Sequence, residues 1–308
     1  SEEVAITHNT TELFNPLANG LPLKRGDEVV FSSLNHAGAS VCWEMRSGEK
    51  DFSVRRFDFP ATRVSEMTTS DVVSLYEDAI GPNTSVLVLP HIDNMVGLRH
   101  PLKEIATMAH DRGVRWVAVD GAQTAGMIPL DLQKTGVDFY ATSAHKWIQS
   151  PKGLGLAYIS KRVQEDLNPM WVTWGQKRWN GTAREFEDYG TRALPAVIAL
   201  GDALSFLSVV PASLREGHHK QLWRTMQELV ADNPAFAWRS PREWQLGGAL
   251  YAIETRGKKS AEVSARIFSD HGFVVRPFAM GDVNTLRVSP NVTNTIDELQ
   301  QFLEVVGR

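Results

Sequence analysis

The sequence predicts an α/β protein: a large domain with a mostly parallel β-sheet sandwiched by helices, and a smaller C-terminal α+β domain. Short apolar runs alternate with helical patterns, as right-handed strand–helix–strand units require. Polar and charged residues directly follow several of these runs. The 308 residues also exceed the roughly 100 to 200 residues of one domain. We expect the large domain at residues 1–200 and the small domain, with connecting helices, at 201–308.

Several elements are expected in the first part of the chain. A strand at Val4–Thr7 precedes a helix that Asn9, Thr10 or Thr11 caps and that Gly20 ends. The run Ser85–Pro90 is continuously apolar, which is typical of a strand buried in a parallel sheet. The other expected elements are a strand in LKRGDEVVFSS, a buried helix around Cys42 and Trp43, a strand near 54–57, a helix at 71–80, and a helix with Leu102, Ile105, Ala106 and Ala109 on one face that ends at Gly113.

The second part begins with SPKGLGLAYIS, which predicts a turn and a return strand, and with a tryptophan-rich loop that is expected to line a pocket or a subunit contact. Two helices follow, one with a buried apolar stripe. Thr295 and Glu298 have capping-box spacing at the start of the last helix. The small domain is expected to contain that stripe (Leu222, Met226, Leu229, Val230), strands in ALYAI, GFVVRP and NTLRVSP, a helix at 261–271, and a final helix with Ile296, Leu299, Phe302, Leu303 and Val306 on one face.

Composition and charge exclude several kinds of partner. The hydrophobic content of 43% is enough to fill a core, and the net charge is −4 without a basic block. This balance predicts no nucleic-acid partner, no membrane partner and a small-molecule ligand. No apolar run approaches the roughly 18 residues of a membrane span. Cys42 is the only cysteine, so no internal disulfide is possible and a reducing cytoplasm is expected.

Two motifs organise the predicted site: VAVDGAQTAG (117–126) and TSAHKW (142–147). In the first, an apolar run stops at Asp120; in the second, a run leads into Ser143, His145 and Lys146. The carboxyl ends of strands in open α/β sheets are where ligands bind. A buried acid beside a reactive lysine suits pyridoxal phosphate, which needs a lysine for its aldehyde and an Asp carboxylate to keep its pyridine nitrogen protonated. Hydroxyl and amide groups would surround its phosphate.

At these motifs the chain resembles the class V aminotransferases, which include the cysteine desulfurases and share fold type I of the pyridoxal phosphate enzymes. The resemblance implies that Lys146 forms the Schiff base and that Asp120 pairs with the pyridine nitrogen. It also implies that Gln123 bonds the ring hydroxyl and that Ser143 and His145 hold the phosphate. By comparison with the family, the chain is expected to begin inside the large domain, without several dozen N-terminal residues.

Further matches follow the family order. NTTE resembles the family's phosphate-binding GTTE, which points to Thr10 and Thr11 at a helix N-terminus. His36 matches the residue that stacks on the cofactor ring, where it also assists proton movement. HIDNMVG resembles the HxSN segment of the desulfurases, so Asn94 is expected near the cofactor hydroxyl and the substrate. Asp93 departs from that pattern and predicts a changed substrate preference.

Two matches come from the second half of the chain. FEDYGT resembles the family motif FExGT with one extra residue, and the resemblance implies that Thr191 reaches the phosphate of a neighbouring subunit in a homodimer. Arg192, where many desulfurases have proline, resembles the isopenicillin N epimerase branch. Arg287 matches the arginine that grips the substrate carboxylate, a task for which the planar guanidinium is suited.

The resemblance implies an enzyme that acts on an amino acid, with Lys146 as the base for the α-proton. It leaves β-elimination, desulfuration, epimerisation and transamination open. No cysteine lies between His271 and Arg287, and Cys42 falls in an apolar helix. We therefore expect no enzyme-bound persulfide and favour a C–S lyase that works by β-elimination. An epimerase or aminotransferase, or a catalytically idle pyridoxal phosphate-binding protein, is the alternative. A metal or nucleotide protein is disfavoured because no ligand spacing is present: His218 and His219 face apart on a helix.

Overall fold

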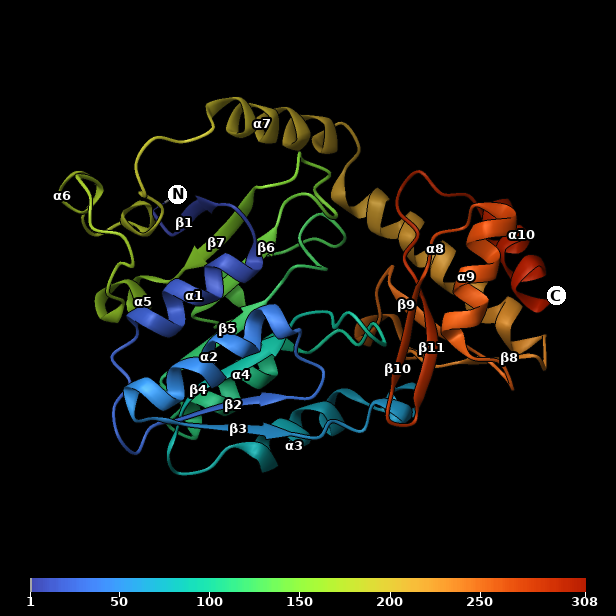
Figure 1. The fold of residues 1–308 in the computed structure, drawn as a ribbon, viewed down its shortest axis with the longest axis horizontal. Coiled ribbons are helices and arrows are strands. Elements are labelled where there is room, and N and C mark those ends of the chain that lie inside the picture. The colour runs from blue at the N-terminus through green and yellow to red at the C-terminus, as the bar shows by residue number, and fades with distance from the viewer. Residues whose placement is uncertain (1) are drawn as a thin grey trace.

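The computed structural model describes residues 2–308 and contains two sheets (Figure 1). The larger has seven strands in the order β1-β7-β6-β5-β4-β2-β3. All neighbouring pairs from β6 to β3 are parallel, whereas β7 is antiparallel to both β6 and β1. The predicted mostly parallel sheet is confirmed. The strands are β1 (Val4–Thr7), β2 (Glu28–Ser32), β3 (Ser53–Phe57), β4 (Thr84–Pro90), β5 (Trp116–Asp120), β6 (Phe139–Ser143) and β7 (Gly155–Ile159).

Helices cover both faces of this sheet (Figure 1). Alternate residues of the central strands point to opposite faces, so Val117 packs with α3 and α4 while Ala118 packs with α1 and α2. Burial on both faces explains why these strands are continuously apolar rather than alternating. The helices are α1 (Thr10–Gly20), α2 (Ala37–Lys50), α3 (Thr69–Ala79), α4 (Leu102–Asp111), α5 (Lys161–Asp166) and α6 (Gly175–Arg178).

The C-terminal part is an α+β unit, as predicted, with an antiparallel sheet in the order β10-β11-β9-β8. The short strand β8 was not predicted, and β10 begins at Arg276, later than the segment GFVVRP suggests. The expected capping box at Thr295 and Glu298 is present. The elements are α7 (Leu194–Ser208), α8 (Ala212–Ala231), β8 (Phe236–Trp238), β9 (Tyr251–Thr255), α9 (Ser260–His271), β10 (Arg276–Met280), β11 (Val283–Val288) and α10 (Ile296–Gly307).

Helix α7 runs across the proposed domain boundary at residue 200. Leu200 and Leu207 pack against Ala144, Ile148 and Leu154, so this helix shares a core with the large domain. We propose that the division falls at the break between α7 and α8, where the chain bends by 74°. Among residues 2–308, no single helix is both long enough and apolar enough to cross a membrane; α7 and α8 reach that length and hydropathy only as this bent pair.

Candidate active site

A cavity of about 470 Å³ lies where β4, β5 and β6 end. Its volume is within the range of small-molecule sites, roughly 300 to 1,000 Å³. The structure brings together all of the predicted site residues except Thr191 and Arg287. Asn9, Gly38, Pro90, Ile92 and Ala122 also line the cavity and were not predicted. The predicted residues that line it are Thr10, Thr11, His36, Asn94, Asp120, Gln123, Ser143, His145 and Lys146.

Asp120 is the last residue of β5 and is only 6% exposed. Its Oδ1 accepts a hydrogen bond of 2.9 Å from the N–H of Ala122. Burial raises the pKa of Asp120, and the Ala122 hydrogen bond and the charge of Lys146 oppose that rise. Gly121 must follow, because a Cβ there would lie 2.0 Å from the ring of Tyr140. A cationic partner in the cavity would therefore stabilise the charged form of the Asp120 carboxylate.

Lys146 follows β6 by three residues and projects into the cavity. Its side chain has no hydrogen bond or ion pair among the described residues 2–308. The Lys146 side chain reaches solvent through the cavity, but the protein around it lowers the pKa of Lys146 by burial. The charge of Asp120 raises this pKa, and the charge of Arg287 lowers it. A lowered pKa favours the uncharged amine, which is the form that attacks an aldehyde or removes a proton.

Gln123 is held by a residue that the sequence did not single out for this role. Trp147 donates from its indole Nε1 to Gln123 Oε1 at 3.0 Å. That bond occupies the amide oxygen of Gln123 and leaves its NH₂ group to donate into the cavity. The other side of Trp147 belongs to the core of the C-terminal domain, together with Leu222 and Met226.

The N-terminus of α1 and the end of β6 form a cluster of donors. The N–H of Thr10 donates to Ser143 Oγ at 3.0 Å, and the two hydroxyl oxygens are 2.8 Å apart. Asn9 caps the helix through Glu12, so the N–H of Thr11 has no partner among the described residues. His145 Nδ1 is buried and also lacks a partner. Unsatisfied donors at a helix N-terminus form a phosphate site.

Gly155 of β7 permits this arrangement, because a Cβ there would lie 2.8 Å from the backbone nitrogen of Asn9. His36 lies across the cavity as the N-cap of α2, and its Nδ1 accepts from the N–H of Gly38 at 3.0 Å. That bond anchors the imidazole at the mouth of the cavity. Its proposed stacking on a cofactor ring stays a prediction.

Arg287 lies beside the cavity and does not line it. Its Nη1 donates to the backbone oxygen of Asn94 at 3.1 Å, which ties β11 to the loop after β4. Asp93 is 1% exposed and accepts from the N–H groups of Met95, Val96 and Leu98 at 2.7, 2.8 and 2.6 Å. The structure gives Asp93 a role in holding this loop. Its predicted effect on substrate preference stays a prediction.

Thr191 is exposed and lines a different cavity, of about 620 Å³, with Val4, Trp179 and Arg192. The buried Glu187 fixes this segment: it accepts from the N–H of Ile6 at 2.6 Å and pairs with Arg192 at 3.1 Å. Within one chain Thr191 therefore does not join the Lys146 site. Its predicted contact with a neighbouring subunit stays a prediction.

Cys42 is 9% exposed and donates from its Sγ to the backbone oxygen of Phe14 at 3.6 Å. Burial raises the pKa of this thiol to about 12. The predicted burial of Cys42 is confirmed. A thiol with this pKa is not a nucleophile at neutral pH, because only the thiolate attacks.

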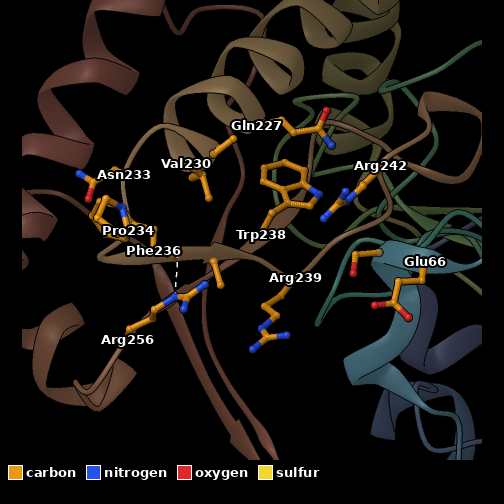
Figure 2. A pocket seen from close by; sticks show the side chains of 13 residues that line it. Glu66, Gln227, Val230, Asn233, Pro234, Phe236, Trp238, Arg239, Arg242 and Arg256 are labelled. Atoms are coloured by element: carbon orange, nitrogen blue, oxygen red, sulfur yellow. Dashed lines mark hydrogen bonds between the residues drawn. The ribbon is translucent and has the colours of Figure 1, made fainter.

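Another cavity of about 620 Å³ lies between the 3₁₀ helix η1 (Ala61–Glu66) and the β8 region (Figure 2). Figure 2 shows Arg239, Arg242 and Arg256 around Trp238. Arg239 bonds Glu254 at 2.6 Å and Arg256 bonds the Phe236 oxygen at 3.2 Å. No lysine or histidine is among the described residues that line it. The acid–lysine pair therefore marks the cavity at β4, β5 and β6 as the candidate active site.

The model of the Aminotransferase class-V family matches residues 1–302. This chain belongs to that family. It is 25% identical to isopenicillin N epimerase from Streptomyces clavuligerus over 98% of this chain and 79% of that protein. It is 27% identical to a probable cysteine desulfurase from Halobacterium salinarum over 99% of this chain and 76% of that protein. The class V member described here is thus a pyridoxal phosphate-dependent enzyme that acts on amino acids.

Solved structures agree with this class V fold. The cysteine desulfurase CsdA from Escherichia coli has a TM-score of 0.83 and 26% identity, covering 99% of this chain and 78% of its own. The cystine C-S lyase C-DES, in complex with cysteine persulfide, has a TM-score of 0.88 and 24% identity, covering 99% and 81%. Fold type I is therefore confirmed.

The cavity fits pyridoxal phosphate on the observations of this structure. The unpartnered amine of Lys146 matches the aldehyde, and buried Asp120 matches the pyridine nitrogen. The unpartnered N–H of Thr11 and the buried, unpartnered Nδ1 of His145 match the phosphate. The Lys146 amine, the Thr11 N–H and the His145 Nδ1 have no hydrogen-bond partner among the described residues, which a polar ligand explains.

Proposed function

We propose that this enzyme is a C–S lyase that eliminates a sulfur-bearing group from the β-carbon of an amino acid. The observation that carries the proposal is the contrast between the two candidate nucleophiles. Lys146 projects into the cavity with a lowered pKa, whereas the only thiol is buried in α2 with a raised one. The chain thus supplies a base at the cavity and no thiolate to take up sulfur. A single unpaired cysteine also fits the reducing cytoplasm that we propose as its compartment.

The residues support the following division of roles. When bound, pyridoxal phosphate supplies an aldehyde for the substrate amine and a ring that accepts electrons from the α-carbon. Lys146 holds that aldehyde in the resting enzyme and then removes the α-proton. The C–S bond breaks, and sulfur leaves with the bonding electron pair as a thiolate that takes up a proton. Asp120 keeps the pyridine nitrogen charged, and Arg287 holds the substrate carboxylate.

An amino-acid epimerase or aminotransferase is the second candidate, and an idle cofactor-binding protein is the third. The similarity to isopenicillin N epimerase over nearly the whole chain favours epimerisation, which uses the same α-proton. Arg192 gives little support to the epimerase candidate, because its guanidinium forms an ion pair and a hydrogen bond with Glu187 in the loop before α7.

The test is incubation of the pyridoxal phosphate-loaded enzyme with S-methyl-L-cysteine, L-cystine and non-sulfur amino acids. We expect pyruvate, ammonia and a thiol or persulfide from the sulfur compounds, equally with wild type and Cys42→Ala. Inverted stereochemistry or keto-acid formation without pyruvate would favour the second candidate. Loss of turnover in Cys42→Ala with cofactor still bound, or a persulfide on Cys42 by mass spectrometry, would refute the lyase proposal.

We also propose that the enzyme is a homodimer in which Thr191 completes the partner's phosphate site. The loop and helix around Thr191 expose large apolar side chains, including Trp174 at 82% and Phe206 at 69%. Such patches mark protein interfaces. Light scattering should give about twice 34.2 kDa. A monomer with full cofactor occupancy would contradict this proposal.

A further inference from the structure

Two arginines face each other across neighbouring strands of the C-terminal sheet. In the register of β10 and β11, Arg276 lies directly opposite Arg287. Directly opposite residues of an antiparallel pair share one face of the sheet, and like charges in that arrangement are destabilising. The pair therefore needs an explanation other than stability.

The side chain of Arg287 is held in place by its neighbours, but one of its hydrogen-bond donors has no partner among the described residues. Its Nη1 bonds the Asn94 oxygen, and the guanidinium carbon lies 5.6 Å from the ring centroid of Phe278. Its Nε is buried and has no partner among the described residues. Burial lowers the pKa of Arg287, the charge of Arg276 lowers it further, and Asp93 acts in the opposite direction. This guanidinium retains a free donor and lies within the field of the second arginine.

Arg276 is exposed, and its side chain has no hydrogen bond or ion pair within residues 2–308. The opposite face of the sheet, with Leu286 and Ile253, is the core of the C-terminal domain. The face with the arginines lies toward the large domain, because Arg287 contacts Asn94 at the edge of the cavity. In Figure 1 the β10–β11 hairpin extends beside that domain.

We propose that Arg276 and Arg287 form a two-arginine substrate site, so that the preferred substrates are amino acids whose side chain carries a second carboxylate. Arg287 holds the α-carboxylate and Arg276 binds the carboxylate beyond the sulfur, each through charge-assisted hydrogen bonds. A second anion also offsets the repulsion between the two guanidinium groups. This inference deepens the C–S lyase proposal. It rests on that proposal only for the presence of a sulfur atom in the substrate side chain.

The kinetic test compares S-carboxymethyl-L-cysteine with its isosteric amide, S-carbamoylmethyl-L-cysteine. We expect wild type to have the higher kcat/KM for the carboxylate, and Arg276→Gln to lower that value about tenfold or more, because a charged hydrogen bond is lost. The value for the amide should change by less than about twofold. Arg276→Lys should retain part of the preference. Arg242→Gln, an exposed arginine on the same domain, is the control for net charge.

A binding test separates this inference from the lyase proposal. Calorimetric titration with glutarate and with its monoamide reports recognition of two carboxylates without any reaction. One outcome is that neither cysteine derivative reacts, that glutarate binds wild type more tightly than it binds Arg276→Gln, and that the monoamide binds both equally. In that case the two-arginine site stands and the lyase proposal fails. If both derivatives react and their ratio is the same in Arg276→Gln, the lyase stands and the site is overturned. The site is also overturned if glutarate and its monoamide bind equally.

Discussion

The hydroxyl oxygens of Thr10 and Ser143 lie 2.8 Å apart, which joins the first turn of α1 to the end of β6. These residues are 133 positions apart in the chain. Their contact places a hydroxyl pair, a free backbone N–H and an imidazole at one point of the cavity. We regard this cluster as the phosphate site.

Replacing Ser143 with Ala should weaken cofactor binding about tenfold or more, because a hydrogen bond to a charged group contributes roughly 1.5 to 3 kcal/mol. Fluorescence titration of the apo enzyme with pyridoxal phosphate measures the change. Ser47→Ala, which removes a surface hydroxyl that donates to the Glu44 oxygen far from the cavity lining, should bind like wild type. Equal dissociation constants for wild type and Ser143→Ala would remove Ser143 from the site.

Borohydride reduction of the loaded enzyme should attach the cofactor irreversibly to Lys146, because its unpartnered amine projects into the cavity. Peptide mass spectrometry should then find the added mass on a peptide that contains Lys146. The variant Lys146→Ala should take up no label, whereas Lys152→Ala, which removes a nearby exposed amine, should be labelled like wild type. Label on Lys152 or Lys161 would reject the assignment.

Asp120→Asn should retain the cofactor and lose most turnover. The side-chain oxygen can still accept from Ala122, so the fold of the turn is kept. A neutral amide, however, does not hold the pyridine nitrogen in its charged form, and the ring becomes a weaker electron acceptor. Steady-state kinetics with measured cofactor occupancy tests this, and Asp131→Asn, on an exposed pair with Lys134, is the control. Near-normal turnover at full occupancy would refute the role of Asp120.

Asp93 should make stability depend on pH in an unusual direction. Burial raises its pKa to about 6, above the roughly 3.9 of an unfolded chain. Between about pH 4 and pH 6 the folded state therefore binds more protons, so this group's contribution to the unfolding free energy falls as pH rises. A shift of about two units corresponds to roughly 3 kcal/mol.

Asp93→Asn lacks this titration. The difference in unfolding free energy, variant minus wild type, should move in favour of the variant by up to roughly 3 kcal/mol from pH 4 to pH 7. Urea unfolding at several pH values measures it. At Asp71 a side-chain hydrogen bond with Thr68 lowers the pKa, so the contribution of this carboxylate is lost as pH falls below about 4. For Asp71→Asn the difference should therefore move the other way, and it should do so at those lower pH values. Movement of both differences in one direction would contradict the assignment.

Much of the large domain was predictable because its strands are short, buried and punctuated by polar residues. The run before Asp120 and the run before Lys146 both end where the structure places strand ends. Local patterns do not show which distant strands pair, so the return strand β7 was predicted but its antiparallel pairing with β1 was not. The three-residue strand β8 gives too few residues for any periodicity.

The site was predicted to the extent that its residues directly follow strands. Asp120 and Ser143 could be assigned to one cavity, because strand ends meet at one edge of a sheet. Thr10 was assigned through the resemblance of NTTE to the family's GTTE. Trp147 and Asp93 could not be assigned their roles, since these depend on side-chain direction within a loop. The pairing of Arg276 with Arg287 depends on register, which requires the partner strand to be known.

Trp147 donates to Gln123 on one side and packs with α8 on the other, where it meets the ring of His219 edge-on at 5.6 Å. The same indole therefore links occupancy of the cavity to the cohesion of the C-terminal core. A ligand that binds only the folded state adds about 2.7 kcal/mol at one hundred times its dissociation constant. Because Trp147 contacts both domains, ligand binding should raise the unfolding free energy of both domains together. The enzyme with bound cofactor should therefore unfold in a single thermal transition. A large-to-small substitution in the core of α8, although far from any ligand atom, should raise the dissociation constant of the cofactor.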